Sequence, residues 1–260
     1  KLLLIGCGKM GGALLRQTLA SELIAEAVVI EPMAASITHA KVTWLNAREK
    51  LDAAYKPDVV LLAVKPQQMA AVLPTYAHLT SSVFLSIAAG VTLAKLQSLL
   101  QNPHAAIVRA MPNLPASIGA GMSVAVANVQ VSSAQRDACD RLLNAVGETA
   151  WIDDEDLLDA VTALSGSGPA YVFALCEAMA KAGEKLGLAP ELSARLARQT
   201  VIGSGALLAD SSDSAETLRH NVTSPGGTTE AALQILLPDL PDLMQNTLSA
   251  ASARAKELAG

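Results

Sequence analysis

Short apolar runs of strand length alternate with helix-like stretches along the first 150 residues. Leu2–Ile5 and Ala27–Ile30 are continuous apolar runs, and comparable runs recur at 41–44, 58–64, 82–87, 105–110, 122–126 and 149–152. Helical stretches are predicted from Asn46, from Pro66, after a Thr92 cap and over 133–146. This alternation is typical of a parallel sheet covered by helices on both faces.

The pattern changes near residue 152. From Asp153 onward strand runs are absent and apolar residues recur at helical spacing. We predict an α/β Rossmann domain over residues 1–152, with a doubly wound and mostly parallel sheet. An all-α C-terminal dimerisation domain is predicted over residues 153–260.

Dimerisation is inferred from one stretch of the second half. Residues 170–186 are apolar nearly all round, so this helix needs partners on most of its surface. Interleaved helices from two subunits would supply them, and the alternative is a helix buried within its own subunit. A mean hydropathy of +0.36 with only 3% aromatic residues also favours a buried subunit interface.

A glycine-rich turn joins the first strand to the first helix. Residues 6–11 have the Gly-x-Gly-x-x-Gly spacing of dinucleotide-binding turns, in which Gly6 permits the tight turn, Gly8 lets the backbone approach a pyrophosphate and Gly11 lets the helix pack closely. Glu31, twenty residues after Gly11, stands where a carboxylate meets the ribose hydroxyls. The alternative is an ordinary turn without a ligand.

Small and polar residues end several of the other predicted strands. These are Lys65, the run 88–90 and the run 111–113. Ligands of open parallel sheets bind outside the carboxyl ends of the strands, so these residues are a predicted cofactor rim. A solvated lysine and ordinary turns are the alternatives.

A second glycine-rich segment interrupts the helical half. Residues 224–229, Ser-Pro-Gly-Gly-Thr-Thr, offer backbone N–H groups and hydroxyls at the start of a helix, which together suit a carboxylate. The alternative is a turn whose Ser and Thr side chains only cap helices.

Composition excludes several function classes. The net charge of −5, without a local Lys/Arg cluster, argues against nucleic acid as a partner. No apolar run approaches the roughly 20 residues of a membrane helix. Three widely separated cysteines suggest no disulfide framework and favour the reducing cytoplasm. No metal site is predicted.

Six motifs in order make the chain resemble the pyrroline-5-carboxylate reductase family. They are GCGKMG (6–11), AVKP (63–66), SIAAGVT (86–92), RAMPN (109–113), LSGSGPAY (164–171) and NVTSPGGTT (221–229), and the resemblance covers nearly the whole chain. It implies hydride transfer from NADPH or NADH to the C=N bond of 1-pyrroline-5-carboxylate, giving L-proline. It also implies a homodimer with interleaved C-terminal helices, which can assemble further.

The resemblance also assigns roles to residues. Thr229 would be catalytic, through a hydrogen bond to the ring nitrogen, and the substrate site would comprise Ser224, Gly226, Gly227, Thr228, Thr229 and Glu155. With the rim, the predicted cofactor contacts are Ile5, Gly6, Cys7, Gly8, Lys9, Met10, Gly11, Glu31, Asn46, Ala63, Val64, Lys65, Pro66, Ile87, Ala88, Ala89, Met111, Asn113 and Asn221.

The cofactor preference stays open. Glu31 should accept a hydrogen bond from a ribose 2′-hydroxyl and repel a 2′-phosphate, which favours NADH. Lys9 or Arg48 could still reach the phosphate and restore the use of NADPH.

Two other functions compete with this interpretation. A β-hydroxyacid dehydrogenase would place a Lys and an Asn on the helix after the serine-glycine motif, where this chain has Val172 and Cys176. A redox sensor that holds a dinucleotide without turnover would not need the carboxylate site at residues 224–229.

Overall fold

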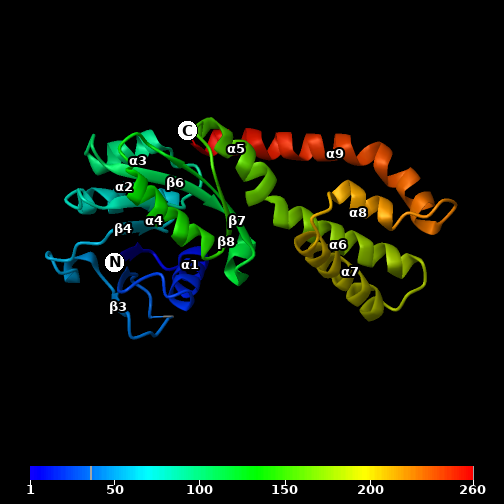
Figure 1. The fold of residues 1–260 in the computed structure, drawn as a ribbon, viewed down its shortest axis with the longest axis horizontal. Helices are drawn as coiled ribbons and strands as arrows, with labels where there is room; N and C mark the ends of the chain where they lie inside the picture. Colours follow the sequence, from blue (N-terminus) through cyan, green and yellow to red (C-terminus); the bar gives the residue numbers. More distant parts are fainter. Residues whose placement is uncertain (36, 260) are drawn as a thin grey trace. The chain divides into compact units, whose positions relative to one another are not determined.

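Figure 1 shows the computed structural model, which describes residues 1–35 and 37–259. Residue contacts divide it into two compact units. One comprises residues 1–166 with the end of the chain from Ala251, and the other comprises residues 167–250.

One eight-stranded sheet forms the centre of the first unit (Figure 1). Its order is β3-β2-β1-β4-β5-β6-β7-β8, in which β1 to β6 are parallel, β7 is antiparallel to β6, and β8 is parallel to β7. The strands are β1 (Leu2–Ile5), β2 (Ala27–Ile30), β3 (Val42–Leu45), β4 (Val59–Leu62), β5 (Val83–Ser86), β6 (Ala106–Pro112), β7 (Gly121–Ala127) and β8 (Gly147–Trp151). The order 3-2-1-4-5-6 is that of a Rossmann fold, which confirms the predicted fold class.

Helices cover both faces of this sheet. They are α1 (Lys9–Ala20), α2 (Met69–Val72), α3 (Leu93–Leu100), α4 (Ser133–Asn144) and α5 (Leu158–Val161). Leu2 and Leu4 of β1 share a buried cluster with Leu14 of α1, whereas Leu3 shares the opposite cluster with Leu96 of α3. Since successive strand side chains point to opposite faces, an uninterrupted apolar run is what a strand buried on both sides requires.

The helix predicted from Asn46 is wrong. Only a 3₁₀ turn, Arg48–Lys50, follows β3, and the chain then enters the core through Leu51 and Tyr55. The Asp52 side chain accepts a hydrogen bond from the Ala54 N–H, and local bonds of this kind compete with helix formation.

The two predicted helix starts that depend on single residues are confirmed. Pro66 is the first residue of a 3₁₀ helix, Pro66–Gln68, that leads into α2. The Thr92 hydroxyl accepts a hydrogen bond from the Lys95 N–H, at 3.2 Å, and so caps α3.

The second unit is helical, as predicted. Its helices are α6 (Gly168–Lys185), α7 (Pro190–Asp210), α8 (Ala215–Asn221) and α9 (Thr228–Ala259), the last of which continues past Ala250. α6 and α7 approach closely, since the Ser193 hydroxyl donates to the Ala180 carbonyl at 2.6 Å and a Cβ on Gly183 would collide with that hydroxyl.

Large apolar side chains lie exposed on these helices within a single chain. Phe173 and Leu175 of α6 are 54% and 53% exposed, and Ile235 of α9 is 78% exposed. Apolar surface of this extent marks an interaction site.

Candidate functional site

The glycine turn lies directly after β1, at the carboxyl end of the central strand. Gly6 has a φ of +85°, and a Cβ there would lie 2.8 Å from Val64 Cγ1. A Cβ on Gly11 would lie 2.7 Å from the Gly6 carbonyl oxygen, so α1 packs closely against the turn. A Cβ on Gly8 would meet no atom within 4 Å. Gly6 and Gly11 therefore serve the fold, whereas Gly8 leaves open space at the helix start.

The N-terminus of α1 is suited to a phosphate. Gly8 provides no side-chain cap, and the first turn of α1 contains no acidic residue. By contrast, the hydroxyls of Thr92, Ser132 and Ser214 cap α3, α4 and α8. Because the first N–H groups of a helix have no partner within it, a pyrophosphate beside Gly8 would satisfy them and gain from the helix dipole. The residues present therefore fit a dinucleotide.

Glu31 is fixed at the carboxyl end of β2. The Cys7 N–H donates to its Oε2 at 2.8 Å and the Met33 N–H donates to its Oε1 at 3.1 Å. A carboxylate oxygen can accept more than one hydrogen bond, so Glu31 can also receive a ribose hydroxyl. A 2′-phosphate would face a negative charge that is held in place.

A cavity of about 700 Å³ opens beside this turn. Eight of the predicted cofactor residues line it: Ile5, Gly6, Gly8, Glu31, Asn46, Ala63, Val64 and Lys65. Cys7, Lys9, Met10 and Gly11 belong to the turn and the start of α1 without lining the cavity, and neither do Pro66, Ile87, Ala88, Ala89, Met111 or Asn113. Asn221 belongs to the second unit.

Sequence reasoning missed one wall of this cavity. Gln68, Ala71, Val72, Thr75 and Tyr76 form it, beside Arg48, already predicted from the sequence as a cation that could reach a 2′-phosphate. Positions 68, 71, 72, 75 and 76 follow the i, i+3, i+4, i+7, i+8 spacing of one helical face, which is the signal that could have found them.

The predicted rim residues at the end of β6 contact Ser165 and Gly166 of the serine-glycine motif at 164–171. The Asn113 side chain accepts from the Met122 N–H at 2.9 Å and donates to the Ser165 hydroxyl at 3.2 Å. A Cβ on Gly166 would lie 2.6 Å from Met111 Cε. Met111 and Asn113 are therefore packed against Gly166 and Ser165, which gives them a structural role here.

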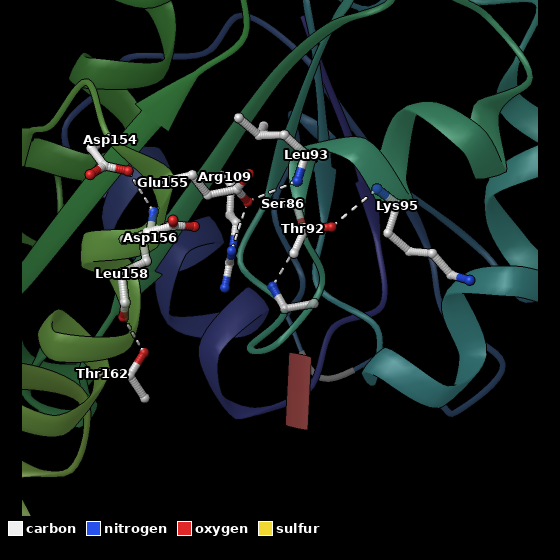
Figure 2. A network of polar contacts seen from close by, with 11 residues as sticks. Ser86, Thr92, Leu93, Lys95, Arg109, Asp154, Glu155, Asp156, Leu158 and Thr162 are labelled. Atoms are coloured by element: carbon white, nitrogen blue, oxygen red, sulfur yellow. Dashed lines mark hydrogen bonds and ion pairs between the residues drawn. The ribbon is translucent and has the colours of Figure 1, made fainter. Parts of the chain in front are cut away.

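Glu155 lies in a buried polar network (Figure 2). Its Oε1 receives the Arg109 guanidinium at 2.7 Å and the Leu93 N–H at 2.8 Å. The Arg109 side chain is 7% exposed and that of Glu155 is 24% exposed. The pair connects β6, the start of α3 and the segment after β8, and it explains Glu155 without a substrate.

The second glycine-rich segment connects α8 to α9 in the helical unit. Gly226 has a φ of +71°, and its N–H donates to Oε2 of Glu230 at 2.8 Å. The Gly227 N–H donates to the Ser224 carbonyl at 3.0 Å. Thr228 and Thr229 are the first two residues of α9, so their N–H groups lack partners within the helix and remain able to bind a carboxylate.

Within 1–35 and 37–259, no group of three or more His, Cys, Asp and Glu side chains could hold a metal ion. No helix in this part of the chain is both long enough and apolar enough to cross a membrane.

Two family models match separate parts of the chain. Residues 1–90 match the family described as NADP oxidoreductase, coenzyme F420-dependent. Residues 155–258 match the family described as pyrroline-5-carboxylate reductase dimerisation.

Relatives and solved structures match over most of the chain. A pyrroline-5-carboxylate reductase of Pseudomonas aeruginosa is 46% identical over 217 residues, covering 82% of this chain and 78% of the relative. The pyrroline-5-carboxylate reductase of Haemophilus influenzae is 36% identical, covering 98% of this chain and 96% of the relative. The structure of the Coxiella burnetii enzyme covers 100% of this chain and 98% of its own, with a TM-score of 0.90 at 34% identity. The Plasmodium falciparum enzyme with NADP bound covers the same shares, with a TM-score of 0.84 at 30% identity.

A Rossmann sheet, an uncapped helix start beside Gly8 and a fixed Glu31 are the features of a dinucleotide-binding protein, and the match of residues 1–90 to an NADP oxidoreductase family makes it an oxidoreductase. Relatives that match at this identity and coverage narrow the class. The chain belongs to the pyrroline-5-carboxylate reductase family.

Proposed function

We propose that this protein reduces the C=N bond of 1-pyrroline-5-carboxylate to give L-proline, with NADPH or NADH as the hydride donor. The observation that supports this most strongly is the match of nearly the whole chain, both units included, to pyrroline-5-carboxylate reductases. The two candidate sites suit the two ligands, a dinucleotide at the glycine turn and a carboxylate at residues 224–229.

The cofactor would be held by the carboxyl ends of the parallel strands. The N-terminus of α1 would bind the pyrophosphate, and Glu31 would bind the adenosine ribose. The cavity residues that belong to or follow β1 and β4 would contact the rest of the dinucleotide. Ile87–Ala89 and Asn221 are further contacts in this proposal. When bound, the reduced nicotinamide supplies the hydride.

The substrate would be held by the start of α9. The backbone of residues 224–228 would bind the carboxylate chiefly through the Thr228 N–H, because Pro225 has no N–H and the Gly226 and Gly227 N–H groups already donate to Glu230 and Ser224. The Thr229 hydroxyl would hydrogen-bond to the ring nitrogen. Because an imine can arrive already protonated, the site needs to orient it and exclude water more than to supply a strong acid. Glu155 is the weakest of the proposed substrate residues, since Arg109 and Leu93 already account for its carboxylate.

The helical half would complete the active site across a dimer. Residues 153–260 are proposed as the substrate and dimerisation domain and residues 1–152 as the cofactor domain. The exposed apolar residues of α6 and α9 support interleaving of two subunits, with residues 221–229 serving the cofactor of the partner. Further assembly of dimers would bury more of this surface. We place the reaction in the cytoplasm, the reducing compartment that three scattered cysteines favour.

The alternatives lack support in this chain. Val172 and Cys176 stand on α6 where a β-hydroxyacid dehydrogenase would need Lys and Asn. A sensor without turnover would leave the start of α9 without a purpose.

The test is the oxidation of NADH and of NADPH by the purified protein with 1-pyrroline-5-carboxylate, with L-proline measured in the same samples. One L-proline formed for each dinucleotide oxidised is the expected result. Tight dinucleotide binding without L-proline would instead assign the chain to the sensor class.

A further inference from the structure

The cavity is also lined by residues 46–49, which follow β3, and by residues of the segment 68–76, and of these Asn46 alone is a predicted cofactor contact. Its walls there are the 3₁₀ turn that carries Arg48 and the segment from Gln68 to Tyr76. Leu51 and Tyr55, which follow the turn, are each 9% exposed and anchor it to the core. Since Glu31 marks the ribose position in Rossmann folds, this part of the cavity lies on the adenosine side of the site.

Arg48 is held in this wall by two contacts. Its Nη2 donates to the Thr75 carbonyl at 3.2 Å, and its guanidinium carbon lies 5.8 Å from the centroid of the Tyr76 ring. Its Nε is buried and has no hydrogen-bond partner among residues 1–35 and 37–259. Guanidinium groups bind phosphate through several N–H donors at once, and the bond to Thr75 uses one of the five N–H groups of Arg48.

Of the charged residues that line the cavity, Arg48 is the one placed to attract an anion near Glu31. Two carboxylates, Glu31 and Glu49, and two cations, Arg48 and Lys65, line it. Lys65 follows β4, on the far side of β1 from β2 and β3. Arg48 is thus the cation on the β3 side of Glu31, and no ion pair to a carboxylate is found for it in the described part of the chain.

We propose that Arg48 is the specificity residue that lets this cavity accept the 2′-phosphate of NADPH in spite of Glu31. The guanidinium, fixed by Thr75 and Tyr76, binds the phosphate, whereas NADH, which has a free 2′-hydroxyl, is bound by Glu31 and makes no use of Arg48. This inference rests on the proposed function, because it assigns a role within the same cofactor site.

The test compares dissociation constants rather than activity. Binding of NADPH and NADH to the intact protein is measured by fluorescence titration, and adenosine 2′,5′-bisphosphate and 5′-AMP are titrated by calorimetry. Loss of a charge-assisted contact typically weakens binding by about tenfold or more. We expect Arg48→Gln to raise the Kd of NADPH and of the bisphosphate by about that factor, with the Kd of NADH and 5′-AMP changed by less than about twofold.

Two variants control this test. Lys50→Gln removes one positive charge from the same 3₁₀ turn, at an exposed residue that does not line the cavity. It should leave the Kd of NADPH and the Kd of NADH unchanged. Arg48→Lys keeps the charge and should retain part of the NADPH affinity. An equal loss for both dinucleotides in Arg48→Gln, or no loss for either, would overturn the inference. If the unmodified protein bound neither dinucleotide, the proposed function itself would fail.

Discussion

Gly6 and Gly8 are two residues apart in one turn, and the structure gives them opposite reasons to be glycine. Gly6 needs a positive φ and has Val64 against the position of a Cβ. Gly8 has an ordinary φ of −69° and open space at that position. The fold requires glycine at position 6, whereas we propose that the bound dinucleotide requires it at position 8.

Alanine at these two positions should separate the two roles. Gly6→Ala is expected to destabilise the fold by about 2 kcal/mol or more, because it combines left-handed backbone strain with a steric clash. Gly8→Ala should lower the free energy of unfolding by about 1 kcal/mol or less. It should still weaken dinucleotide binding at least about tenfold, because its methyl group would project toward the pyrophosphate. Urea unfolding and dinucleotide titration measure both. If Gly8→Ala bound the dinucleotide as tightly as the wild type, the proposed pyrophosphate site at this turn would be contradicted.

Buried titratable side chains give the protein a predictable response to alkali. Burial raises the pKa of Tyr76 to about 12, although the nearby Arg48 charge lowers it in part, and burial raises the pKa of the Cys139 thiol to about 12. In the unfolded chain these groups lose their protons from about pH 9 to 10. The folded state holds protons that the unfolded state releases, so this stabilisation is complete below pH 9 and is lost as the pH rises toward 12.

Urea unfolding between pH 8 and 11 checks this expectation. The free energy of unfolding should fall steadily above pH 9, and Tyr76→Phe should reduce the slope above pH 10. An unchanged slope in that variant would mean that the Tyr76 hydroxyl ionises freely in the folded protein.

At the scale of elements, the Arg109–Glu155 pair joins β6 to the segment that follows β8 (Figure 2). Removing one member of a largely buried ion pair leaves the other charge without compensation. We expect Glu155→Ala to destabilise the protein by about 3 kcal/mol, and the double variant Arg109→Met with Glu155→Leu to recover much of that loss. Thermal unfolding of the three proteins measures this.

A further variant, Glu155→Gln, tests the role of Glu155. A folded Glu155→Gln protein should keep its KM for 1-pyrroline-5-carboxylate within about threefold if Glu155 serves only this network. A large rise in the KM, with the free energy of unfolding unchanged, would indicate that Glu155 contacts the substrate.

Elements differ in how far the sequence predicts them. The strands of the sheet were predictable because a strand buried on both faces needs a continuous apolar run, as Leu2–Ile5 and Val59–Leu62 have. The segment after Asn46 was not predictable, because its conformation depends on local hydrogen bonds such as the one that the Asp52 side chain accepts from the Ala54 N–H. The Arg109–Glu155 pair joins residues 46 positions apart, and no local pattern encodes such a contact.

The candidate site shows the same division. The glycine turn and Glu31 were predictable because they obey a fixed spacing, and eight predicted residues line the cavity. The residues at the start of α9 remain predictions, since they would act on a ligand across a dimer.

For the whole molecule, the exposed apolar surface of the helical unit is the main evidence for a dimer. Phe173 and Leu175 of α6 should become buried on association. Phe173→Glu would place a charge in that interface, so sedimentation should show the wild type as a dimer or larger and the variant as mostly monomer. The variant should still bind the dinucleotide, because the glycine-turn cavity lies within the first unit, but should lose turnover. A fully active monomer would contradict an active site completed by the partner.

The central claim is that this protein reduces 1-pyrroline-5-carboxylate at a site that includes Thr229. The measurement is the initial rate of NADH and NADPH oxidation with this substrate for the wild type, Thr229→Ala and Thr229→Ser. We expect turnover in the wild type, a fall in kcat/KM of about 10- to 100-fold in Thr229→Ala, and partial recovery in Thr229→Ser, which keeps the hydroxyl. Dinucleotide binding should be the same in all three. Absence of turnover in the wild type, or an undiminished rate in Thr229→Ala, would contradict the account.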